Sequence, residues 1–265
     1  MLADVQSRED KRNIRIDKVG VKDVKYPITV LDRKRKFQST IADINMYVLL
    51  SSQFKGTHMS RFMEILNENR YAVDIKKVRF ILHEMRERLN AEESHVEIRF
   101  PYFLEKEAPV TKAKSLACYK CGIEAFSGKK DDITVFAQVP VSSVCPCSKE
   151  ISLRGAHNQR GMVTIKVRFN ELVWLEELIE IGEKSGSSPV YPLLKREDEK
   201  FVTEYAYDHP YFVEDIARNV TQVLDKDNRI FWYSVEVENF ESIHNHNAYA
   251  YIERGLKQFL TNGKS

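Results

Sequence analysis

Two cysteines, a histidine and two arginines fall within the twenty residues 142–161, "SSVCPCSKEISLRGAHNQRG". Thiolate and imidazole groups are common protein ligands of zinc and of other first-row metals. The stretch therefore predicts metal chemistry, of one of two kinds. A closed set of four protein ligands holds structure, whereas a set with an open position leaves room for water and for catalysis.

The closed alternative is a four-thiolate zinc site. "CYKCG" supplies Cys118 and Cys121 with the two-residue spacer and trailing glycine that are common in zinc turns. Pro146 disfavours helical geometry at Cys145, so we expect residues 145–147 to be extended, with the sulfurs of Cys145 and Cys147 on the same side. For Cys118 and Cys121 the favoured interpretation is that they are ordinary strand residues, with a second metal site or a redox pair as the alternatives.

The open alternative combines a cysteine with His157 and a carboxylate, for which Glu199 in "REDEK" is a candidate. A metal that lacks one protein ligand keeps a water and lowers its pKa to roughly 7, which suits hydrolysis. His244 and His246, in "ESIHNHNAY", would face the same way on an extended chain and could carry protons near neutral pH.

Composition bounds the class of protein. The chain has 265 residues, 43% of them apolar and 30% charged, with a formal net charge of +2. No apolar run is long enough to span a membrane, and the charge is too small for a nucleic-acid footprint over the whole surface. Residues 1–15 are charged and lack the apolar core of a signal peptide, so we expect a cytoplasmic protein with no membrane or nucleic-acid partner.

The elements that must position these residues follow a repeated order. Residues 1–38 are weakly patterned and predict an arm with little core. We then expect a strand at 39–52, helices at 57–70 and 74–90 with caps at Thr57 and Asp74, and strands at 95–103, 113–120 and 131–144.

The second half repeats that order, with a strand at 162–169, a helix at 170–186, a polar crossing at 195–210, a helix from Pro210, and strands at 229–240 and 248–255. Such an order predicts an α+β fold of two tandem modules, 39–150 and 151–265, each an antiparallel sheet with helices packed on one face. The cysteine and histidine stretch lies at their junction, where binding sites often form.

Four separated motifs closely resemble the prokaryotic GTP cyclohydrolase type IB family. They are "GTHMSRF" at 56–62, "CPCSKEISLRGAHNQRG" at 145–161, "DEKFVTEYAYDHPYFVED" at 198–215 and "ESIHNHNAYA" at 241–250, and the match extends from about residue 15 to the C-terminus. The resemblance implies the tunnelling fold, assembled as a homotetramer with active sites at subunit interfaces. It also implies that GTP is opened by hydrolysis to 7,8-dihydroneopterin triphosphate and formate, at the start of folate biosynthesis.

Carried over residue by residue, the resemblance implies a divalent metal, zinc, manganese or iron, bound by Cys145, His157 and Glu199. It implies that Glu214 anchors the guanine, and that His244 is a catalytic histidine near the metal. A mixed set of sulfur, nitrogen and oxygen ligands accepts several of these metals. A carboxylate can accept both the N1–H and the amino group of guanine, a donor pair that adenine lacks.

Cys147 belongs to the same catalytic motif as Cys145, and either ligates the metal or lines the site. The triphosphate needs cations, and four basic residues lie within the matching motifs: Arg61, Lys149, Arg154 and Arg160. Three alternatives stay open. They are an archaeal relative that yields dihydroneopterin cyclic phosphate, a non-catalytic nucleotide- or RNA-binding module with a four-cysteine zinc site, and a tunnelling-fold reductase that uses a cysteine nucleophile and NADPH.

Overall fold

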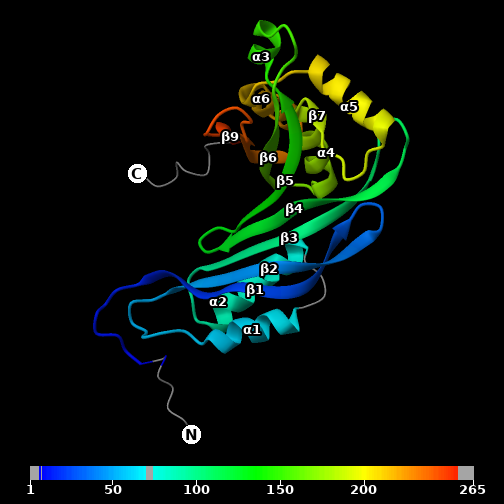
Figure 1. The fold of residues 1–265 in the computed structure, drawn as a ribbon. Coiled ribbons are helices and arrows are strands. Elements are labelled where there is room, and N and C mark those ends of the chain that lie inside the picture. The colour runs from blue at the N-terminus through cyan, green and yellow to red at the C-terminus, as the bar shows by residue number, and fades with distance from the viewer. Residues whose placement is uncertain (1–5, 7, 70–73, 256–265) are drawn as a thin grey trace. The chain divides into compact units, whose positions relative to one another are not determined.

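The computed structural model describes residues 6, 8–69 and 74–255 of the chain (Figure 1). None of the described helices has the length and apolar character that crossing a membrane requires. In chain order, the elements are β1 (Ile16–Asp32), β2 (Lys36–Leu50), α1 (Met59–Glu68), α2 (Ile75–Arg88), β3 (Ser94–Glu107), β4 (Lys114–Ser127), β5 (Asp132–Val144), α3 (Pro146–Ile151), β6 (Asn158–Phe169), α4 (Leu175–Ser185), β7 (Ser188–Pro189), α5 (Arg196–Asp208), α6 (Val213–Leu224), β8 (Ile230–Asn239) and β9 (Ala248–Gly255).

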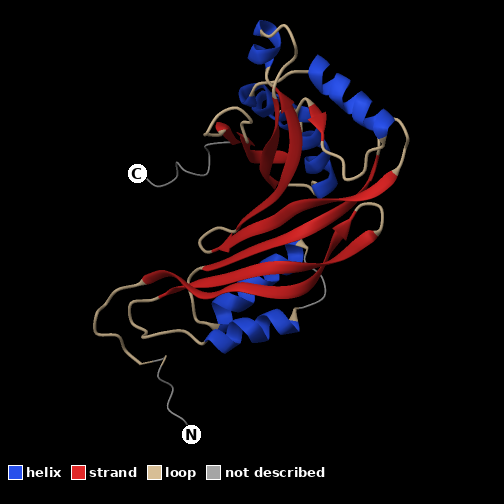
Figure 2. Cartoon of the chain, in the orientation of Figure 1, coloured by secondary structure: helices blue, strands red, loops and turns tan. Residues whose placement is uncertain are grey.

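The strands form an antiparallel sheet (Figure 2). Hydrogen-bonded neighbours follow the order β1-β2-β3-β4-β5-β6-β8-β9, with β7 paired to β5. The pairings β1–β2, β2–β3, β5–β6, β6–β8 and β8–β9 are all antiparallel. Apart from β7, each strand lies beside the next one in sequence, and the connections β2–β3 and β6–β8 contain the helices α1 and α2 and the helices α4, α5 and α6. The predicted α+β class, an antiparallel sheet with helices on one face, is confirmed.

Contacts between Cα positions divide the chain into two compact units. One contains Met1–Pro101 and Gly122–Thr134, and the other contains Tyr102–Cys121 and Val135–Ser265. The strands β3, β4 and β5 therefore contribute one end to each unit. This division interleaves in sequence, whereas the modules 39–150 and 151–265 meet at one junction, so the tandem modules stay a prediction.

The first unit contains a strand within the predicted arm. Residues 16–32 form β1, which pairs with β2 from Ile16 to Asp32 and buries Ile28 and Val30. The first half of β1 is largely exposed, which explains why apolar and polar residues alternate only weakly there. The predicted cap of α2 is confirmed, because the Asp74 side chain accepts a hydrogen bond from the Lys77 backbone N–H at 2.8 Å. The cap of α1 is His58, one residue after the predicted Thr57.

The core of the second unit lies between its strands and two amphipathic helices. Val139, Val163 and Val237 come from the neighbouring strands β5, β6 and β8 and are fully buried. Helix α6 packs on β8 and on α4, and buries an apolar face at helical spacing. Gly182 lets α4 approach β5 closely, because a Cβ at that position would lie 2.8 Å from the Val139 side chain.

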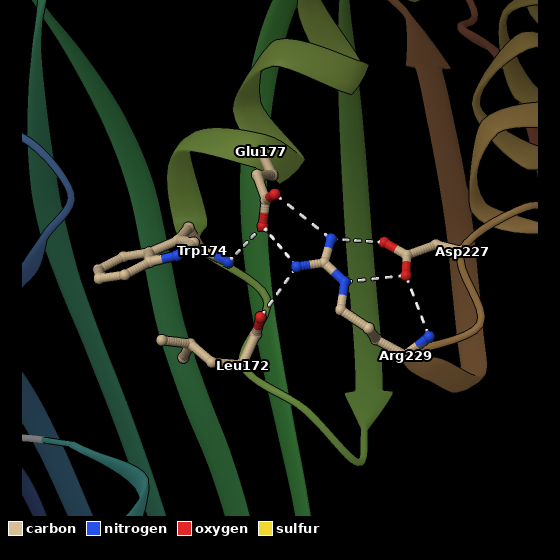
Figure 3. Close-up of polar contacts among 5 residues, drawn as sticks. All are labelled: Leu172, Trp174, Glu177, Asp227 and Arg229. Atoms are coloured by element: carbon tan, nitrogen blue, oxygen red, sulfur yellow. Dashed lines mark hydrogen bonds and ion pairs between the residues drawn. The ribbon is translucent and has the colours of Figure 1, made fainter.

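A cluster of charged groups fixes the start of α4 beside the turn that precedes β8 (Figure 3). The Arg229 guanidinium donates to both carboxylate oxygens of Asp227, to Glu177 and to the Leu172 carbonyl oxygen. Glu177 also accepts the Trp174 backbone N–H at 2.9 Å, which caps the helix. These bonds explain why α4 begins at Leu175 and not at residue 170, where the sequence predicts the helix to begin.

Two predictions of local structure are wrong. The expected polar crossing at 195–210 contains the 13-residue helix α5, whose apolar positions are too few to show a buried stripe in the sequence. Residues 145–147 are not one extended segment, because Pro146 begins α3. Cys145 is extended, as a residue before proline should be, but a proline at the first helical position is itself a helix-start signal.

Candidate functional site

Cys145 and His157 lie opposite each other where β5 ends and β6 begins. The last ladder pair of these strands is Val144 with Asn158, and the next residues are joined by a hydrogen bond of 3.1 Å from the Cys145 N–H to the His157 carbonyl oxygen. Residues that face each other across an antiparallel ladder place their side chains on the same face. The fold therefore sets the backbones of a cysteine and a histidine of the central motif opposite each other.

Ser148 ties this pair to the first turn of α3. Its hydroxyl donates to the Cys145 carbonyl oxygen and accepts the His157 N–H, both at 3.1 Å. Its own backbone N–H points at the Cys145 sulfur, 3.5 Å away. One serine thus bonds to the backbone of both predicted ligands.

The loop between β8 and β9 reaches the His157 ring. His157 Nδ1 lies 3.0 Å from Gln159 Oε1 and 3.3 Å from Ser242 Oγ. The Gln159 amide nitrogen donates to Glu241 Oε1 at 3.2 Å. Two of the four motifs therefore meet at one imidazole. Sequence reasoning did not single out Gln159, although its place two residues after His157 on a strand puts both side chains on one face.

The structure places Cys147 differently from the prediction. Cys147 belongs to α3 and is exposed, whereas Cys145 precedes the helix and is half-buried. The two sulfurs are therefore not displayed side by side from an extended segment, and the helix start at Pro146 is the reason. Cys145 is the cysteine whose backbone N–H bonds to the His157 carbonyl oxygen.

Glu199 lies in the first turn of α5 and is exposed. Within the residues that the structure describes, no three His, Cys, Asp or Glu side chains gather as a metal-binding group. One chain thus brings together two of the three predicted ligands, a thiol and an imidazole of suitable chemistry, and leaves the carboxylate apart. Thiol and imidazole groups are common ligands of first-row metals, so the chemistry of this pair is compatible with one.

The neighbour of Glu199 anchors the helix. Asp198 is fully buried, and its carboxylate accepts the N–H groups of Val110, Thr111 and Lys195 at 2.9, 2.9 and 3.0 Å and the Thr111 hydroxyl at 2.6 Å. Burial alone would raise the pKa of Asp198, but these hydrogen bonds to the ionised form lower it overall. The start of α5 is therefore tied to the turn between β3 and β4.

The predicted substrate-binding residues are spread over both units. Arg61 lies in the first unit, where its guanidinium donates to the Arg88 carbonyl oxygen at 2.6 Å. In the second unit, Lys149 donates to the Tyr207 carbonyl oxygen and lies over the Tyr207 ring, 4.3 Å from its centroid. Arg154 and Arg160 are exposed.

The remaining two predicted residues are exposed side chains of the second unit. Glu214 is in the first turn of α6. His244 is in the loop before β9, and its ring stacks on that of His246 with 5.1 Å between centroids. Because Ser242 fixes this loop at His157, His244 is held only two residues from a contact with the imidazole.

The four-cysteine alternative is not supported. Cys118 and Cys121 are three residues apart on β4, so their side chains point to opposite faces of the strand. Cys118 is exposed and Cys121 is buried, and burial raises the pKa of both thiols. Two thiols on opposite faces of a sheet cannot share one ion, so these cysteines are strand residues in this structure.

A cavity of about 420 Å³ lies between α4, α6 and the start of β8, away from Cys145 and His157. Two of its cations are paired: Arg229 with Asp227 and Glu177 (Figure 3), and Lys184 with Glu180. The cavity therefore offers no free charge to a phosphate or a carboxylate, and it is not the candidate site.

Comparisons with known proteins agree on one family. A family model described as type I GTP cyclohydrolase folE2 matches residues 2–250. The GTP cyclohydrolase FolE2 of Citrifermentans bemidjiense is 58% identical over 253 residues, which cover 96% of this chain and 95% of that protein. The GTP cyclohydrolase FolE2 of Geobacter sulfurreducens is 55% identical over 257 residues, which cover 97% and 100%.

Among solved structures, urate oxidase from Bacillus sp. TB-90 resembles the fold with a TM-score of 0.53. The alignment covers 91% of this chain and all of that one, at 8% sequence identity. At so low a sequence identity, the similarity of the two structures shows a shared tunnelling fold and does not show a shared reaction.

Proposed function

The chain belongs to the type I GTP cyclohydrolase FolE2 family, and we propose that it opens the guanine ring of GTP by hydrolysis. A first water adds at C8 and cleaves one of its bonds to a ring nitrogen, and a second water hydrolyses the resulting formamide, so that both nitrogens become amines and C8 leaves as formate; one water is released again when the new ring closes. The remaining triphosphate rearranges and closes to 7,8-dihydroneopterin triphosphate. The observation that carries this proposal is the Cys145–His157 pair, because the two family motif residues with ligand chemistry face each other across β5 and β6.

We propose that Cys145, His157 and Glu199 hold a divalent ion, zinc, manganese or iron. Bound there, such an ion supplies a nucleophilic water at neutral pH. The mixed sulfur, nitrogen and oxygen set supports this range of metals, because it lacks the all-thiolate softness that favours zinc. The free thiol that Cys145 needs for this role is consistent with a reducing, cytoplasmic setting.

A homotetramer with sites at subunit interfaces would complete the ligand set. Glu199 is exposed on α5 and lies outside any group of three ligands in the single described chain. Packing of α5 from a second copy over the Cys145–His157 pair would bring a carboxylate to it. If one copy supplies the thiol and the imidazole and another supplies the carboxylate, the metal binds only to the assembled oligomer and stabilises it.

The other motif residues take roles in binding and proton transfer. Glu214 accepts two hydrogen bonds from the guanine N1–H and amino group, which adenine does not offer. His244 gives a proton to a ring nitrogen as its bond to C8 breaks, and the Ser242 contact with His157 supports its place near that bond. The triphosphate takes its cations from four side chains: Arg61, Lys149, Arg154 and Arg160.

Formate release from GTP tests the proposal. The full-length protein supplied with Mn(II) should release formate and form a product that fluoresces after oxidation, with GTP strongly preferred over ATP. The mass of the product should retain all three phosphates, whereas a cyclic phosphate would have lost pyrophosphate. Failure to release formate with zinc, manganese and iron alike would contradict the proposed activity.

A further inference from the structure

The His157 ring is the first member of a short hydrogen-bonded chain. Its Nδ1 lies 3.0 Å from the amide oxygen of Gln159, and the Gln159 amide nitrogen lies 3.2 Å from a carboxylate oxygen of Glu241. Gln159 is nine-tenths buried. All three residues belong to the second unit.

Strand register builds this chain. His157 and Gln159 are two residues apart where β6 begins, so their side chains share a face. Gly161 pairs with Asn239 in the β6–β8 ladder, and the Phe240 N–H bonds to the Arg160 carbonyl oxygen at 2.9 Å. Continued by one step, this register sets Glu241 opposite Gln159. The contacts therefore follow from the backbone and not from a chance meeting of surface side chains.

Donor and acceptor chemistry fixes the proton on the ring. An ionised carboxylate can only accept, so the nitrogen of the Gln159 amide must face Glu241. The amide oxygen then faces His157, and because it also can only accept, Nδ1 must be the ring nitrogen that carries the hydrogen. The Ser242 hydroxyl, 3.3 Å from Nδ1, can accept from the same N–H. In the neutral ring, the lone pair is then on Nε2.

We propose that Gln159, oriented by Glu241, is a positioning residue that holds His157 in the Nδ1–H tautomer and leaves Nε2 to bind the metal. The proposal rests on the proposed function for one point, that the group bound by Nε2 is a metal ion. The tautomer itself follows from the contacts alone. A partner that fixes the second nitrogen of a ligating histidine sets both the orientation of the ring and its strength as a ligand.

Nitrogen-15 NMR of the histidine rings tests the tautomer directly. In the full-length protein without metal, above the pH at which the ring is protonated, His157 should show a pyrrole-type Nδ1 and a pyridine-type Nε2. Zinc should then shift the Nε2 resonance and leave Nδ1 protonated. Assignment comes from the spectrum of the His157→Gln variant. A pyridine-type Nδ1 in the metal-free protein would overturn the proposal.

Gln159→Leu removes the acceptor and keeps the size of the side chain. We expect a second tautomer in the spectrum and a Kd for Mn(II) that rises roughly 10–100-fold, the usual cost of losing such a partner. The matched control is Gln138→Leu, the same change on the neighbouring strand β5, where the amide contacts Thr164. That variant should leave the His157 resonances and the Kd unchanged. An unchanged spectrum and Kd in Gln159→Leu would count against the proposal.

Glu241→Gln covers the case in which Gln159→Leu does not fold. Glu241 is half-buried, and the substitution preserves its shape while it removes the acceptor-only group. The Gln159 amide can then turn over, so the second tautomer should appear without loss of fold. A single Nδ1–H tautomer in this variant would show that Glu241 does not orient the amide. Because the NMR result needs neither GTP nor turnover, it separates this proposal from a failure of the proposed activity.

Discussion

Arg229 and Asp227 form a two-pronged ion pair. The Arg229 Nε donates to Asp227 Oδ1 at 2.9 Å, and Nη2 donates to Oδ2 at 2.7 Å (Figure 3). The remaining donors reach Glu177 and the Leu172 carbonyl oxygen, so one guanidinium joins the turn before β8 to the start of α4. Parallel bonds of this kind fix geometry as well as charge.

Arg229→Ala should therefore destabilise the protein. We expect a loss of about 1–2 kcal/mol in the free energy of unfolding, because the pair is partly exposed but its carboxylates lose several bonds at once. The control is Arg218→Ala, which removes an exposed pair with Asp215 one turn away on α6 and should cost less than about 0.5 kcal/mol. Urea unfolding of both variants measures the difference. Equal losses would show that the network does not hold α4.

The same pair predicts a dependence of stability on pH. The hydrogen bond from Arg229 lowers the pKa of Asp227 below its usual 3.8, so the folded protein binds that proton less tightly than the unfolded chain. Its contribution is complete above the unfolded pKa and is lost as the pH falls through the lower folded pKa. Unfolding midpoints measured from about pH 6 to pH 3 should fall less steeply in Asp227→Asn than in the wild type. Parallel curves would contradict this assignment.

Loss of Cys145 should remove the metal without unfolding the protein. Cys145→Ser should abolish formate release. It should also lower the affinity for Mn(II) by more than the roughly 10–100-fold that is lost with a residue that only hydrogen-bonds to a ligand, such as Gln159. Cys118→Ser, on the exposed face of β4, should retain both metal content and activity. A structural zinc site predicts the opposite, with both variants unfolded. Metal analysis beside melting curves distinguishes the two.

Mixed assemblies test whether the ligand set closes between copies. His157→Ala and Glu199→Ala should each be inactive alone. Expressed together, they should regain activity at roughly a quarter of the sites, because a site that takes its histidine and its carboxylate from different chains can receive both wild-type residues. A mixture of His157→Ala with Cys145→Ala is the control and should stay inactive. Failure of the first mixture would place His157 and Glu199 of a working site in the same chain.

Several strands of the sheet could be predicted from the sequence because their side chains alternate between a buried and a more exposed face, as in β3 and β8. The strand predicted at 248–255 matches β9 at both ends. β1 was missed because its first half is exposed on both faces and shows little alternation. Helix α5 was missed because it buries only Asp198 and Ala206 fully, so its polar sequence resembles a solvated crossing.

The site was predictable in its chemistry and only partly in its geometry. Residue types and spacing left a closed four-cysteine site and an open site with His157 as alternatives, and the metal role of Cys145 and His157 stays a prediction; strand register sets the backbones of these two residues opposite each other. The same reasoning misplaced Cys147, because a proline after an extended residue fits both an extended segment and a helix start. The bridging role of Ser148 depends on three hydrogen bonds that no local pattern encodes.

Asp198 and Glu199 are adjacent acids with unlike tasks. The first has all its acceptor capacity taken up inside the protein, while the second extends into solvent from the same turn of α5. Both residues carry the same charge, yet exchanging them would place a glutamate, which is longer by one methylene, among the hydrogen-bond donors that surround Asp198. Length, and not acidity, is what distinguishes these two positions in the fold.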